Sequence, residues 1–306
     1  MLYCIANFML LGGIQVANPS PLRYPGGKNR LAGFIGLAIQ NLNLARCTYI
    51  EPFAGGAGVA LTLLLDGIVE DIVINDFDKA IYSFWRAVKT DPKWLINRIA
   101  NTPITIDEWR RQKEIYTTAK AYSLDLAFAT LFLNRTNRSG ILNAGPIGGY
   151  SQAGEWKLGV RFDRAKLISK IEAISARRNH ITVYNKDIFS LLQHYLPTLE
   201  ADAFIYFDPP YYNKGQKLYK NFLTPTDHQN IRNAIVNQIA APWLMTYDDV
   251  AEIKELYAGY TTRNYNLTYS AANKGAASEL MIFSDSAFCP TQTQLAKHRI
   301  TVDFQE

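Results

Sequence analysis

The chain has 306 residues, of which 48% are hydrophobic and 19% charged, a composition typical of a folded protein with one large domain or a domain that carries an insertion. Its three cysteines, Cys4, Cys47 and Cys289, are too widely spaced for a zinc cluster or a disulfide framework, which favours a metal-free protein of the reducing cytoplasm. The formal net charge of +5 is small, so its distribution along the chain matters more than its size.

The N-terminal segment MLYCIANFMLLGGIQVANPS is mostly apolar. A signal peptide would have basic residues ahead of the apolar run, and this segment has none there. No apolar run in the chain is long enough to span a bilayer. We therefore expect a packed or dangling leader and no association with a membrane.

Strand patterns alternate with helix patterns along most of the chain. Apolar, β-branched runs are each followed by a polar or glycine-rich turn, and most of these turns lead into a helical segment. This order predicts an α/β fold with a doubly wound, mostly parallel sheet. The segments are CTYIEPFAGGAGVALTLLL, DIVINDFDKAIYSFWRAVK, HITVYNKDIFSLLQHYL, DAFIYFDPPYY and QIAAPWLMTYDDVAEIKELY, then TTRNYNLTYS and SELMIFSD, which read as closing antiparallel strands.

The alternation stops between residues 92 and 178. Helical patterns cover 94–103, 105–116, 123–136 and 163–178, and the glycine-rich stretch NRSGILNAGPIGGY lies between the last two. We therefore expect a mainly helical inserted domain at 92–178, within a sheet domain formed by 18–91 and 179–306.

Positive charge is concentrated in the same part of the chain. Residues 101–180 hold 13 of the 32 Lys and Arg but only 7 of the 27 Asp and Glu, so the rest of the chain is close to neutral. A solvated surface and a surface that meets phosphate groups both explain this excess, and charge alone does not separate them.

An acidic residue follows each of the first four predicted strands: Glu51, Asp76, Asp187 and Asp208. Ligands of open α/β sheets bind at the carboxyl ends of the strands. These four carboxylates should therefore gather along one edge of the sheet.

The first strand turns into its helix through Gly55, Gly56 and Gly58, and glycines let a ligand approach the backbone closely. Asp76 ends the next strand, where a carboxylate can accept hydrogen bonds from ribose hydroxyls. This pair suits NAD as well as S-adenosylmethionine, although the run does not match the GxGxxG pattern of dinucleotide sites. A tight packing turn without a ligand is the simpler alternative.

Several polar residues allow two interpretations. RYPGGKNRL lacks the first glycine and the final hydroxyl residue of a phosphate loop, so Lys28 is either a surface lysine or part of a loop shaped by glycines. Asp187 either contacts the adenine amine of a cofactor or caps its helix, and Asp248 and Asp249 are expected to form an N-cap. The histidines His180, His194, His228 and His298 have no ligand spacing and are expected to be structural.

The run FIYFDPPYY ends a strand with an acid, two prolines and two tyrosines. Two prolines offer no backbone N–H and cannot continue a sheet, so Asp208 stands on a rigid corner. An amino group on an aromatic ring is a poor nucleophile, because its lone pair is delocalised. Acceptors on its N–H bonds, the Asp208 carboxylate and the Pro209 carbonyl held by Pro210, would stabilise positive charge as a methyl group arrives. The Tyr211 ring offers a face on which a flipped base can stack, whereas a strand-ending turn with a capping Asp is the alternative.

Taken in order, the motifs RYPGGK, EPFAGGAG, IND, FLNRTNRSGILNAGPIGGY and DPPY resemble the Dam-like class of adenine-specific DNA methyltransferases, over about Pro21 to Phe283. The resemblance implies a Rossmann-like methyltransferase fold and transfer of a methyl group from S-adenosylmethionine to the N6 of adenine in duplex DNA. It also implies that the DPPY motif is catalytic. The stretch after the first Asn-Arg pair is shorter and less aromatic than is typical of the class, so no particular target sequence is implied.

The resemblance further implies which residues bind cofactor and DNA. Tyr24 and Lys28 of the first motif would contact the cofactor, and Asp76 would hold its ribose. The turn that wraps the methionine part corresponds to Glu51, Pro52, Phe53, Ala54 and Gly55, with Asp208 next to the cofactor. The insertion would be the target-recognition domain that binds DNA, and its candidate DNA contacts are Arg135, Asn137, Arg138 and Asn143.

The main prediction is a site-specific DNA adenine methyltransferase that flips its target base, with double-stranded DNA and a companion restriction endonuclease as partners, and a monomeric state. A related enzyme acting on RNA adenine or on a protein glutamine amide is an alternative, because an amide nitrogen poses the same electronic problem. The basic insertion favours nucleic acid over protein. An NAD-dependent enzyme would leave the DPPY run unexplained, and complete motifs argue against a catalytically silent DNA-binding module.

Overall fold

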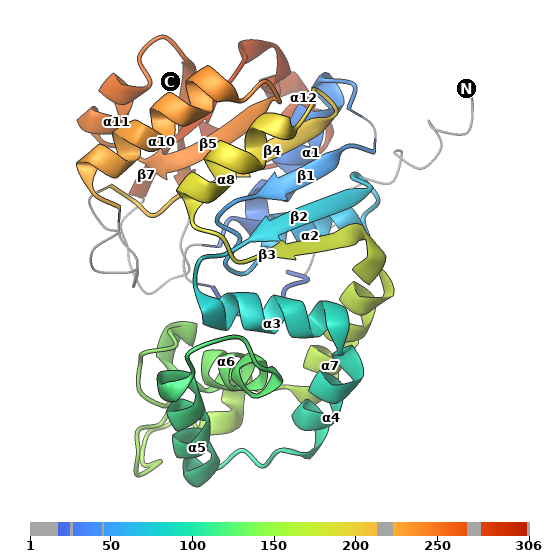
Figure 1. Cartoon of the computed structure of the whole chain (residues 1–306), viewed down its shortest axis with the longest axis vertical. Coiled ribbons are helices and arrows are strands. Elements are labelled where there is room, and N and C mark those ends of the chain that lie inside the picture. The colour runs from blue at the N-terminus through green and yellow to red at the C-terminus, as the bar shows by residue number, and fades with distance from the viewer. Residues whose placement is uncertain (1–17, 25–26, 45, 213–222, 268–276, 305–306) are drawn as a thin grey trace.

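One sheet of eight strands runs through the protein (Figure 1). The computed structural model describes residues 18–24, 27–44, 46–212, 223–267 and 277–304, so the apolar leader and Cys4 lie outside the described residues. The strands are β1 (Thr48–Glu51), β2 (Asp71–Asn75), β3 (Ile181–Tyr184), β4 (Ala203–Phe207), β5 (Trp243–Asp248), β6 (Thr261–Leu267), β7 (Ala277–Phe283) and β8 (Asp303–Phe304).

The strand order is β3-β2-β1-β4-β5-β7-β6-β8. The first five strands in this order, from β3 to β5, pair with their neighbours in parallel. Strands β7, β6 and β8 extend the sheet beyond β5, and each of them pairs antiparallel. The chain builds outward from β1 in one direction and then from β4 in the other, and such a switch point opens a crevice at the carboxyl ends of the two strands. The prediction of a doubly wound, mostly parallel sheet with antiparallel closing strands is confirmed.

Helices cover both faces of the sheet and form a further group at one end of the molecule (Figure 1). The α-helices are α1 (Ala32–Asn41), α2 (Gly58–Leu65), α3 (Lys79–Thr90), α4 (Pro92–Asn101), α5 (Ile106–Thr118), α6 (Leu124–Thr136), α7 (Arg164–Ala176), α8 (Ile188–His194), α10 (Pro225–Gln238), α11 (Ala251–Leu256) and α12 (Gln292–Lys297). Short 3₁₀ turns are η2 (Asn29–Leu31), η3 (Arg138–Gly140), η4 (Leu158–Arg161), η5 (Arg178–His180), η6 (Leu196–Thr198) and η7 (Ser286–Phe288).

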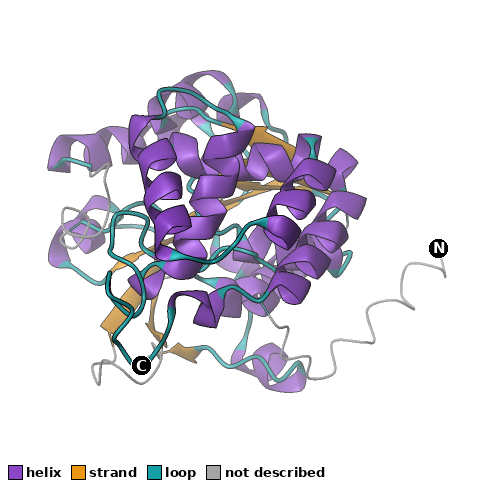
Figure 2. Ribbon diagram, turned by 90° about the horizontal axis from the view of Figure 1, so that it is seen from below, coloured by secondary structure: helices purple, strands orange, loops and turns teal. Residues whose placement is uncertain are grey.

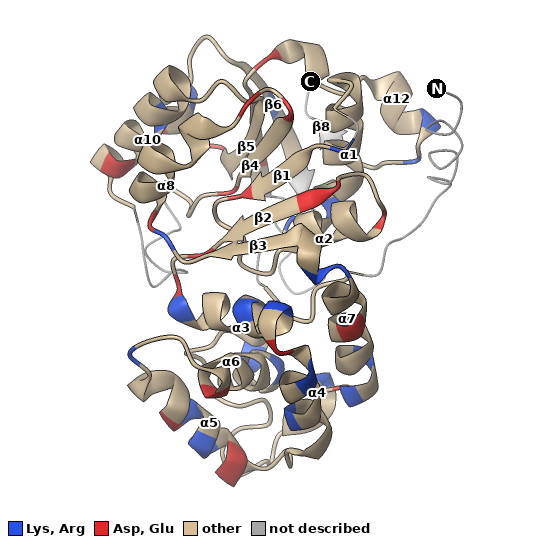
Figure 3. Ribbon diagram, turned by 45° about the vertical axis from the view of Figure 1, so that its right-hand side comes forward, with Lys and Arg blue, Asp and Glu red and all other residues tan. Residues whose placement is uncertain are grey.

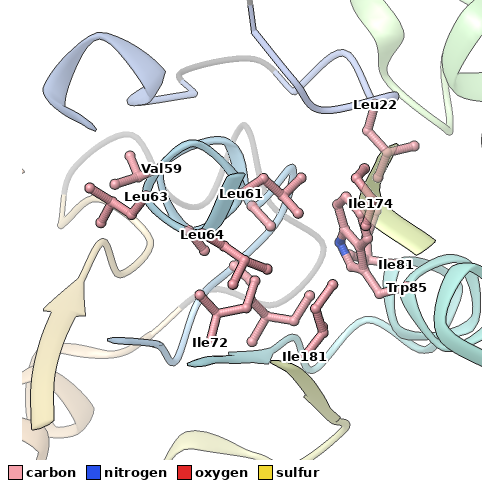
Figure 4. Close-up of a cluster of buried hydrophobic side chains, with 14 of the residues drawn as sticks. Leu22, Val59, Leu61, Leu63, Leu64, Ile72, Ile81, Trp85, Ile174 and Ile181 are labelled. Carbon is pink, nitrogen blue, oxygen red and sulfur yellow. The ribbon is translucent and has the colours of Figure 1, made fainter. Parts of the chain in front are cut away.

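Side chains of successive strand residues point to opposite faces, and both faces are buried. Phe204 of β4 belongs to the hydrophobic cluster shared with α1, α2 and α3, whereas its neighbour Ile205 belongs to the cluster shared with α8, α10 and α11. Figure 4 shows part of the first cluster, in which Leu64 of α2 lies over Ile72 of β2. A sheet covered on both faces needs continuous apolar strands, which explains the run Phe-Ile-Tyr-Phe ahead of Asp208.

Helices α4 to α7 lie together beside α3, below the β3 edge of the sheet (Figures 1 and 2). Helix α6 is at their centre, because it is apolar on all sides and packs against α3, α4 and α5. The helices predicted for this part of the chain are therefore confirmed. One hydrophobic cluster continues from the sheet through α3 into α6, and the division into domains at residues 92 and 178 stays a prediction.

Candidate active site

A cleft of about 310 Å³ lies at the carboxyl ends of β1, β2, β3 and β4. The acids that follow these four strands, Glu51, Asp76, Asp187 and Asp208, all line it, as the alternation of strands and helices predicts. Gly56 and Gly58 of the glycine turn therefore share one cavity with Asp208 and Pro210 of the DPPY corner, whereas Pro209 and Tyr211 are not part of its lining. Of the residues predicted to bind the cofactor, those in the lining are Tyr24, Lys28, Glu51, Pro52, Phe53, Ala54, Asp76, Asp187 and Asp208.

The turn between β1 and α2 holds the first wall of the cleft. Gly55 has a φ of +47°, and a Cβ there would lie only 2.7 Å from Cε1 of Tyr24. The Trp85 indole N–H donates to the Gly55 carbonyl at 2.9 Å, which fixes the turn from α3. The sequence needs glycine here because the Tyr24 ring packs directly against the backbone.

Asp76 is tied to the same turn. Its Oδ2 accepts a hydrogen bond from the Gly55 N–H at 2.9 Å, and its Oδ1 accepts one from the Asp78 N–H at 2.8 Å. Burial raises the pKa of Asp76 to about 7, against the effect of these hydrogen bonds. Gly55 and Asp76, which were paired as a nucleotide-binding signal in the sequence, are thus in direct contact. Each oxygen of the Asp76 carboxylate keeps a lone pair that can accept a hydrogen bond from a ligand.

Glu51 is only 5% exposed at the end of β1. Its Oε1 accepts hydrogen bonds from the Tyr49 hydroxyl and the Ala60 N–H, both at 3.0 Å. Burial and, to a smaller extent, the nearby charge of Asp208 raise the pKa of Glu51 to about 8, against the effect of these hydrogen bonds. A cationic ligand in the cleft would favour the ionised form of this carboxyl.

Asp208 lines the cleft at the end of β4 and is half-buried. Its Oδ1 accepts a hydrogen bond from the Thr246 hydroxyl at 2.8 Å, and Oδ2 has no donor among the described residues. Burial raises the pKa of Asp208 to about 6, while the charge of Lys28 lowers it. Within the described part of the chain, no N–H is bonded to the carbonyl of Pro209. One carboxylate oxygen and one carbonyl are thus available as acceptors at this corner.

Lys28 is buried, with 4% of its surface exposed, so the interpretation as a plain surface lysine is wrong. Its ammonium forms an ion pair with Glu279 of β7, and it donates a hydrogen bond to the Tyr211 hydroxyl at 2.8 Å. Glu279 carries no local motif and was not predicted. Pro25 and Gly26 of the same loop lie outside the described residues.

Asp187 caps α8, since its Oδ1 accepts a hydrogen bond from the Ser190 N–H at 2.9 Å. That bond lowers the pKa of Asp187. Its position in the cleft wall keeps a cofactor contact as a prediction. The N-cap predicted at Asp248 and Asp249 is wrong, because α11 begins after Val250, and Asp248 instead accepts a bond from the Tyr212 N–H at 2.9 Å.

Two aromatic residues of the cleft were missed by the sequence analysis. Phe77 and Phe189 both line it and are 57% and 38% exposed, which is unusual for large apolar rings. Phe77 directly follows Asp76, and Phe189 follows Asp187 by two positions. An aromatic residue just after each strand-end acid was the signal available in the sequence.

The cleft suits a cationic nucleoside better than a dinucleotide. Its charged lining consists of Glu51, Asp76, Asp78, Asp187 and Asp208 against Lys28 and Lys186. Carboxylates in excess oppose a pyrophosphate and favour a sulfonium or ammonium group. The exposed rings of Phe77 and Phe189 offer flat apolar surfaces for an adenine. These residues therefore fit S-adenosylmethionine and disfavour NAD.

The predicted DNA contacts in the helical segment divide into two groups. Arg138 and Asn143 are exposed on the glycine-rich stretch. Arg135 is half-buried and its guanidinium donates to the Pro21 carbonyl. Asn137 is fully buried, with its Oδ1 accepting from the Trp109 indole N–H at 2.7 Å. The interpretation of Asn137 as a DNA contact does not fit this burial, and its amide instead holds the loop together.

A cluster of arginines lies where the N-terminal segment meets the helical segment. Atom NH1 of Arg23 is buried and has no hydrogen-bond partner among the described residues. The pKa of Arg23 is lowered mainly by burial and, to a smaller extent, by the like charge of Arg161. The pKa of Arg135 is lowered to about 10, mainly by burial and to a smaller extent by the charge of Arg23. Figure 3 shows further Lys and Arg around α3, α4 and α7. This concentration of positive charge suits phosphate groups.

Metal and membrane features are both absent from the described residues. No group of three or more His, Cys, Asp or Glu there is placed to hold a metal ion. His180 bonds to Asp71 at 3.1 Å and His228 to the Tyr247 hydroxyl at 2.8 Å, which are structural roles. Among the helices that the structure describes, none combines the length and the apolarity of a membrane span.

Comparison with known proteins agrees with the motifs. Residues 24–271 match the family described as D12 class N6 adenine-specific DNA methyltransferase. The Type II methyltransferase M.MjaIII of Methanocaldococcus jannaschii is 24% identical over 206 residues, which are 62% of this chain and 68% of the relative. The family match confirms the resemblance that the sequence motifs indicated.

Two solved structures have a low overall similarity. The rRNA methyltransferase aviRa from Streptomyces viridochromogenes has a TM-score of 0.40 and 14% identity, over 85% of this chain and 86% of that chain. The SAM-dependent methyltransferase from Agrobacterium tumefaciens has a TM-score of 0.41 and 8% identity, over 83% of this chain and 61% of that chain. At these scores, neither likeness carries an argument about this protein.

Proposed function

Because the chain belongs to the D12 class of N6 adenine-specific DNA methyltransferases, we propose that it methylates N6 of adenine at a specific sequence in double-stranded DNA. The observation that carries the proposal is the shared cleft of the DPPY corner and the glycine turn. Asp208 presents a carboxylate oxygen that has no donor among the described residues, in the same cavity that Asp76 and the Tyr24 ring line. A cofactor site and an acceptor for an amino group therefore face each other.

The cofactor of the family is S-adenosylmethionine, which when bound supplies an electrophilic methyl group on a positively charged sulfur. Asp76 would accept hydrogen bonds from the ribose hydroxyls, and Phe77 and Phe189 would contact the adenine. Glu51, Phe53 and the carboxylate edge of the cleft would surround the cationic end. These residues bind and orient the cofactor, and burial of the cleft limits water.

The target amino group is held by the DPPY corner. Asp208 Oδ2 and the Pro209 carbonyl would each accept one N–H bond of the amine, which raises electron density on its nitrogen. Pro209 and Pro210 keep both acceptors rigid, so the geometry costs no rearrangement during reaction. After transfer the nitrogen loses its extra proton to the Asp208 carboxylate or to water, and a pKa of about 6 makes the carboxylate the stronger base of the two.

Base flipping is the second part of the proposal. The amino group of a paired adenine lies inside the duplex, so the base must leave the stack before it can reach Asp208. The half-buried Tyr211 ring follows the acceptors directly and is the proposed stacking surface. Extrusion into this corner would bring the nitrogen in line with the bound cofactor.

DNA would meet the protein along its arginines. Arg138 and Asn143 are exposed on the glycine-rich stretch, and Arg23, whose Nη1 has no hydrogen-bond partner among the described residues, lies beside Gly140 of that stretch. We propose that Arg23 and Arg161 contact phosphates and that the glycine-rich stretch contacts base edges. A monomeric state, a cytoplasmic location and a companion endonuclease stay predictions, the last of them supported by the relative named a Type II methyltransferase.

The deciding experiment measures transfer of a labelled methyl group. Purified protein and labelled S-adenosylmethionine are incubated separately with duplex DNA, RNA of the same sequence and a protein mixture. Label should enter duplex DNA as N6-methyladenine, and long-read sequencing would identify the target site. Label found only in RNA, or only in protein glutamine, would replace DNA as the substrate.

A matched pair of variants separates catalysis from binding. Asp208→Ala removes the acceptor and should abolish transfer while DNA and cofactor still bind. Arg23→Ala leaves the acceptor in place and should weaken DNA binding, with a less steep dependence on salt. Turnover retained in Asp208→Ala would contradict the mechanism.

A further inference from the structure

Four side chains from distant parts of the chain form a buried polar cluster beneath the DPPY corner. Glu279 Oε1 accepts a hydrogen bond from the Tyr211 hydroxyl, and Oε2 accepts one from the Tyr265 hydroxyl, both at 2.5 Å. Lys28 pairs with Oε2 of the same carboxylate and donates to the Tyr211 hydroxyl at 2.8 Å. The Tyr211 hydroxyl is therefore held between a cation and an anion.

Stability alone is a weak reason for such a cluster. The side chains of Lys28 and Glu279 are 2% and 3% exposed, so both charges have lost almost all contact with water. Removing two charges from water costs several kcal/mol per ion, and apolar residues of the same size often serve stability as well or better. Burial alone would raise the pKa of Glu279, yet Lys28 and the two tyrosines bring it below its ordinary value. The carboxylate is thus kept ionised inside the protein.

The cluster influences both the position of the Tyr211 ring and the charge near Asp208. Tyr211 follows the two prolines, and its hydroxyl anchors the far end of its ring through Lys28 and Glu279. The Lys28 ammonium and the Glu279 carboxylate have opposite effects on the Asp208 carboxyl. A Lys28 without its partner would be attracted to Asp208 and would compete for the oxygen that the amine needs.

We propose that Glu279 is a positioning residue for methyl transfer, an inference that rests on the proposed function. Glu279 holds the Tyr211 ring in place and keeps the Lys28 ammonium away from Asp208. Glu279 itself does not line the cleft. It acts through Tyr211 and Lys28, two of the residues bonded to it, and it connects β7 to the loop before η2 across most of the chain.

The main test is Glu279→Gln, which keeps the shape of the side chain and removes its charge. We expect kcat to fall about 10- to 100-fold, because a small misplacement of reacting groups has effects of this size. The affinity for S-adenosylmethionine should stay within threefold, roughly 0.6 kcal/mol. Glu279→Asp should recover part of kcat, since it restores the charge. The matched control is Glu108→Gln, which neutralises a buried glutamate on α5 that pairs with Arg111 and lies outside the cleft.

A pH profile distinguishes positioning from a merely structural role. Glu279 raises the pKa of Asp208 and Lys28 lowers it. In a plot of kcat against pH, neutralising Glu279 should therefore move the fall of kcat on the acidic side to lower pH. Glu108→Gln should leave that fall at the same pH as in the native protein. A kcat within threefold of native with the fall at an unchanged pH, or a loss matched by Glu108→Gln, would overturn the proposal.

A spectroscopic readout keeps the inference testable if the substrate assignment fails. Fluorotyrosine is placed at position 211 and its ¹⁹F chemical shift is measured. With Glu279 present, the shift should differ from that of free fluorotyrosine. In Glu279→Gln, the shift should move toward the value of free fluorotyrosine, because the ring is no longer anchored. An identical signal in both proteins would refute the anchoring of Tyr211. A native protein without methyl transfer to any substrate would instead refute the proposed function.

Discussion

Replacing Gly55 by alanine tests how the turn after β1 shapes the cofactor cleft. Gly55 has a φ of +47°, and an added Cβ would lie 2.7 Å from Cε1 and 2.8 Å from Cζ of Tyr24. Carbon atoms rest at about 3.5–4.0 Å, so the ring must move by about 1 Å. The left-handed backbone adds a cost of about 1–2 kcal/mol for a residue with a Cβ.

Gly67→Ala is the matched control for the backbone cost. Gly67 has a φ of +70°, and a Cβ there meets no atom of the described residues within 4 Å. Both variants carry the backbone cost, and Gly55→Ala adds the displacement of the Tyr24 ring, so its Tm should fall at least as far, with roughly 2–4 °C per kcal/mol for a large domain. Only Gly55→Ala moves a ring that lines the cleft, so only it should weaken S-adenosylmethionine binding, by at least tenfold, or about 1.4 kcal/mol.

Calorimetric titration of both variants with S-adenosylmethionine, together with thermal denaturation, measures the two effects separately. We expect Tm to fall in both variants, by at least as much in Gly55→Ala, and the affinity for S-adenosylmethionine to fall only in Gly55→Ala. If Gly55→Ala binds the cofactor within twofold of native, the Tyr24 ring does not form a wall of the cofactor site, and the assignment of this cleft must be revised.

Three further outcomes are expected. Single-turnover rates should fall as pH drops through about 6, the pKa to which burial raises Asp208, because protonation removes the acceptor; a rate independent of pH between 5 and 7 would contradict this role. Phe77→Ala and Phe189→Ala should each weaken S-adenosylmethionine binding by about tenfold in calorimetry without lowering Tm, since stacking on a base contributes about 1–3 kcal/mol and both rings are exposed; unchanged affinity would place the adenine elsewhere. Asn137→Ala should lower the free energy of unfolding by about 1–3 kcal/mol in denaturant titration, because the buried Trp109 indole N–H loses its acceptor; a selective loss of DNA binding at native stability would restore Asn137 as a contact.

The local features of the fold were predictable because they depend on short-range patterns. Apolar runs followed by acids predicted β1 to β5, and the convergence of Glu51, Asp76, Asp187 and Asp208 followed from the rule for parallel sheets. Helix α1 was missed because the segment Ala32–Asn41 is apolar on nearly all sides and shows no helical period. Strand β8 was missed because it has only two residues, Asp303 and Phe304.

What the sequence determined by itself is the chemistry at each strand end, because acid, prolines and glycines act through their own backbone and side-chain properties. The distant partners that these residues meet follow from the packing of the folded chain. Nothing near Lys28 in the chain predicts its ion pair with Glu279, which lies 251 positions away. Nothing in the Asn137 motif predicts burial under Trp109. Packing of the sheet against its helices brings such pairs together, since burial forces each polar group to find a partner wherever the fold supplies one.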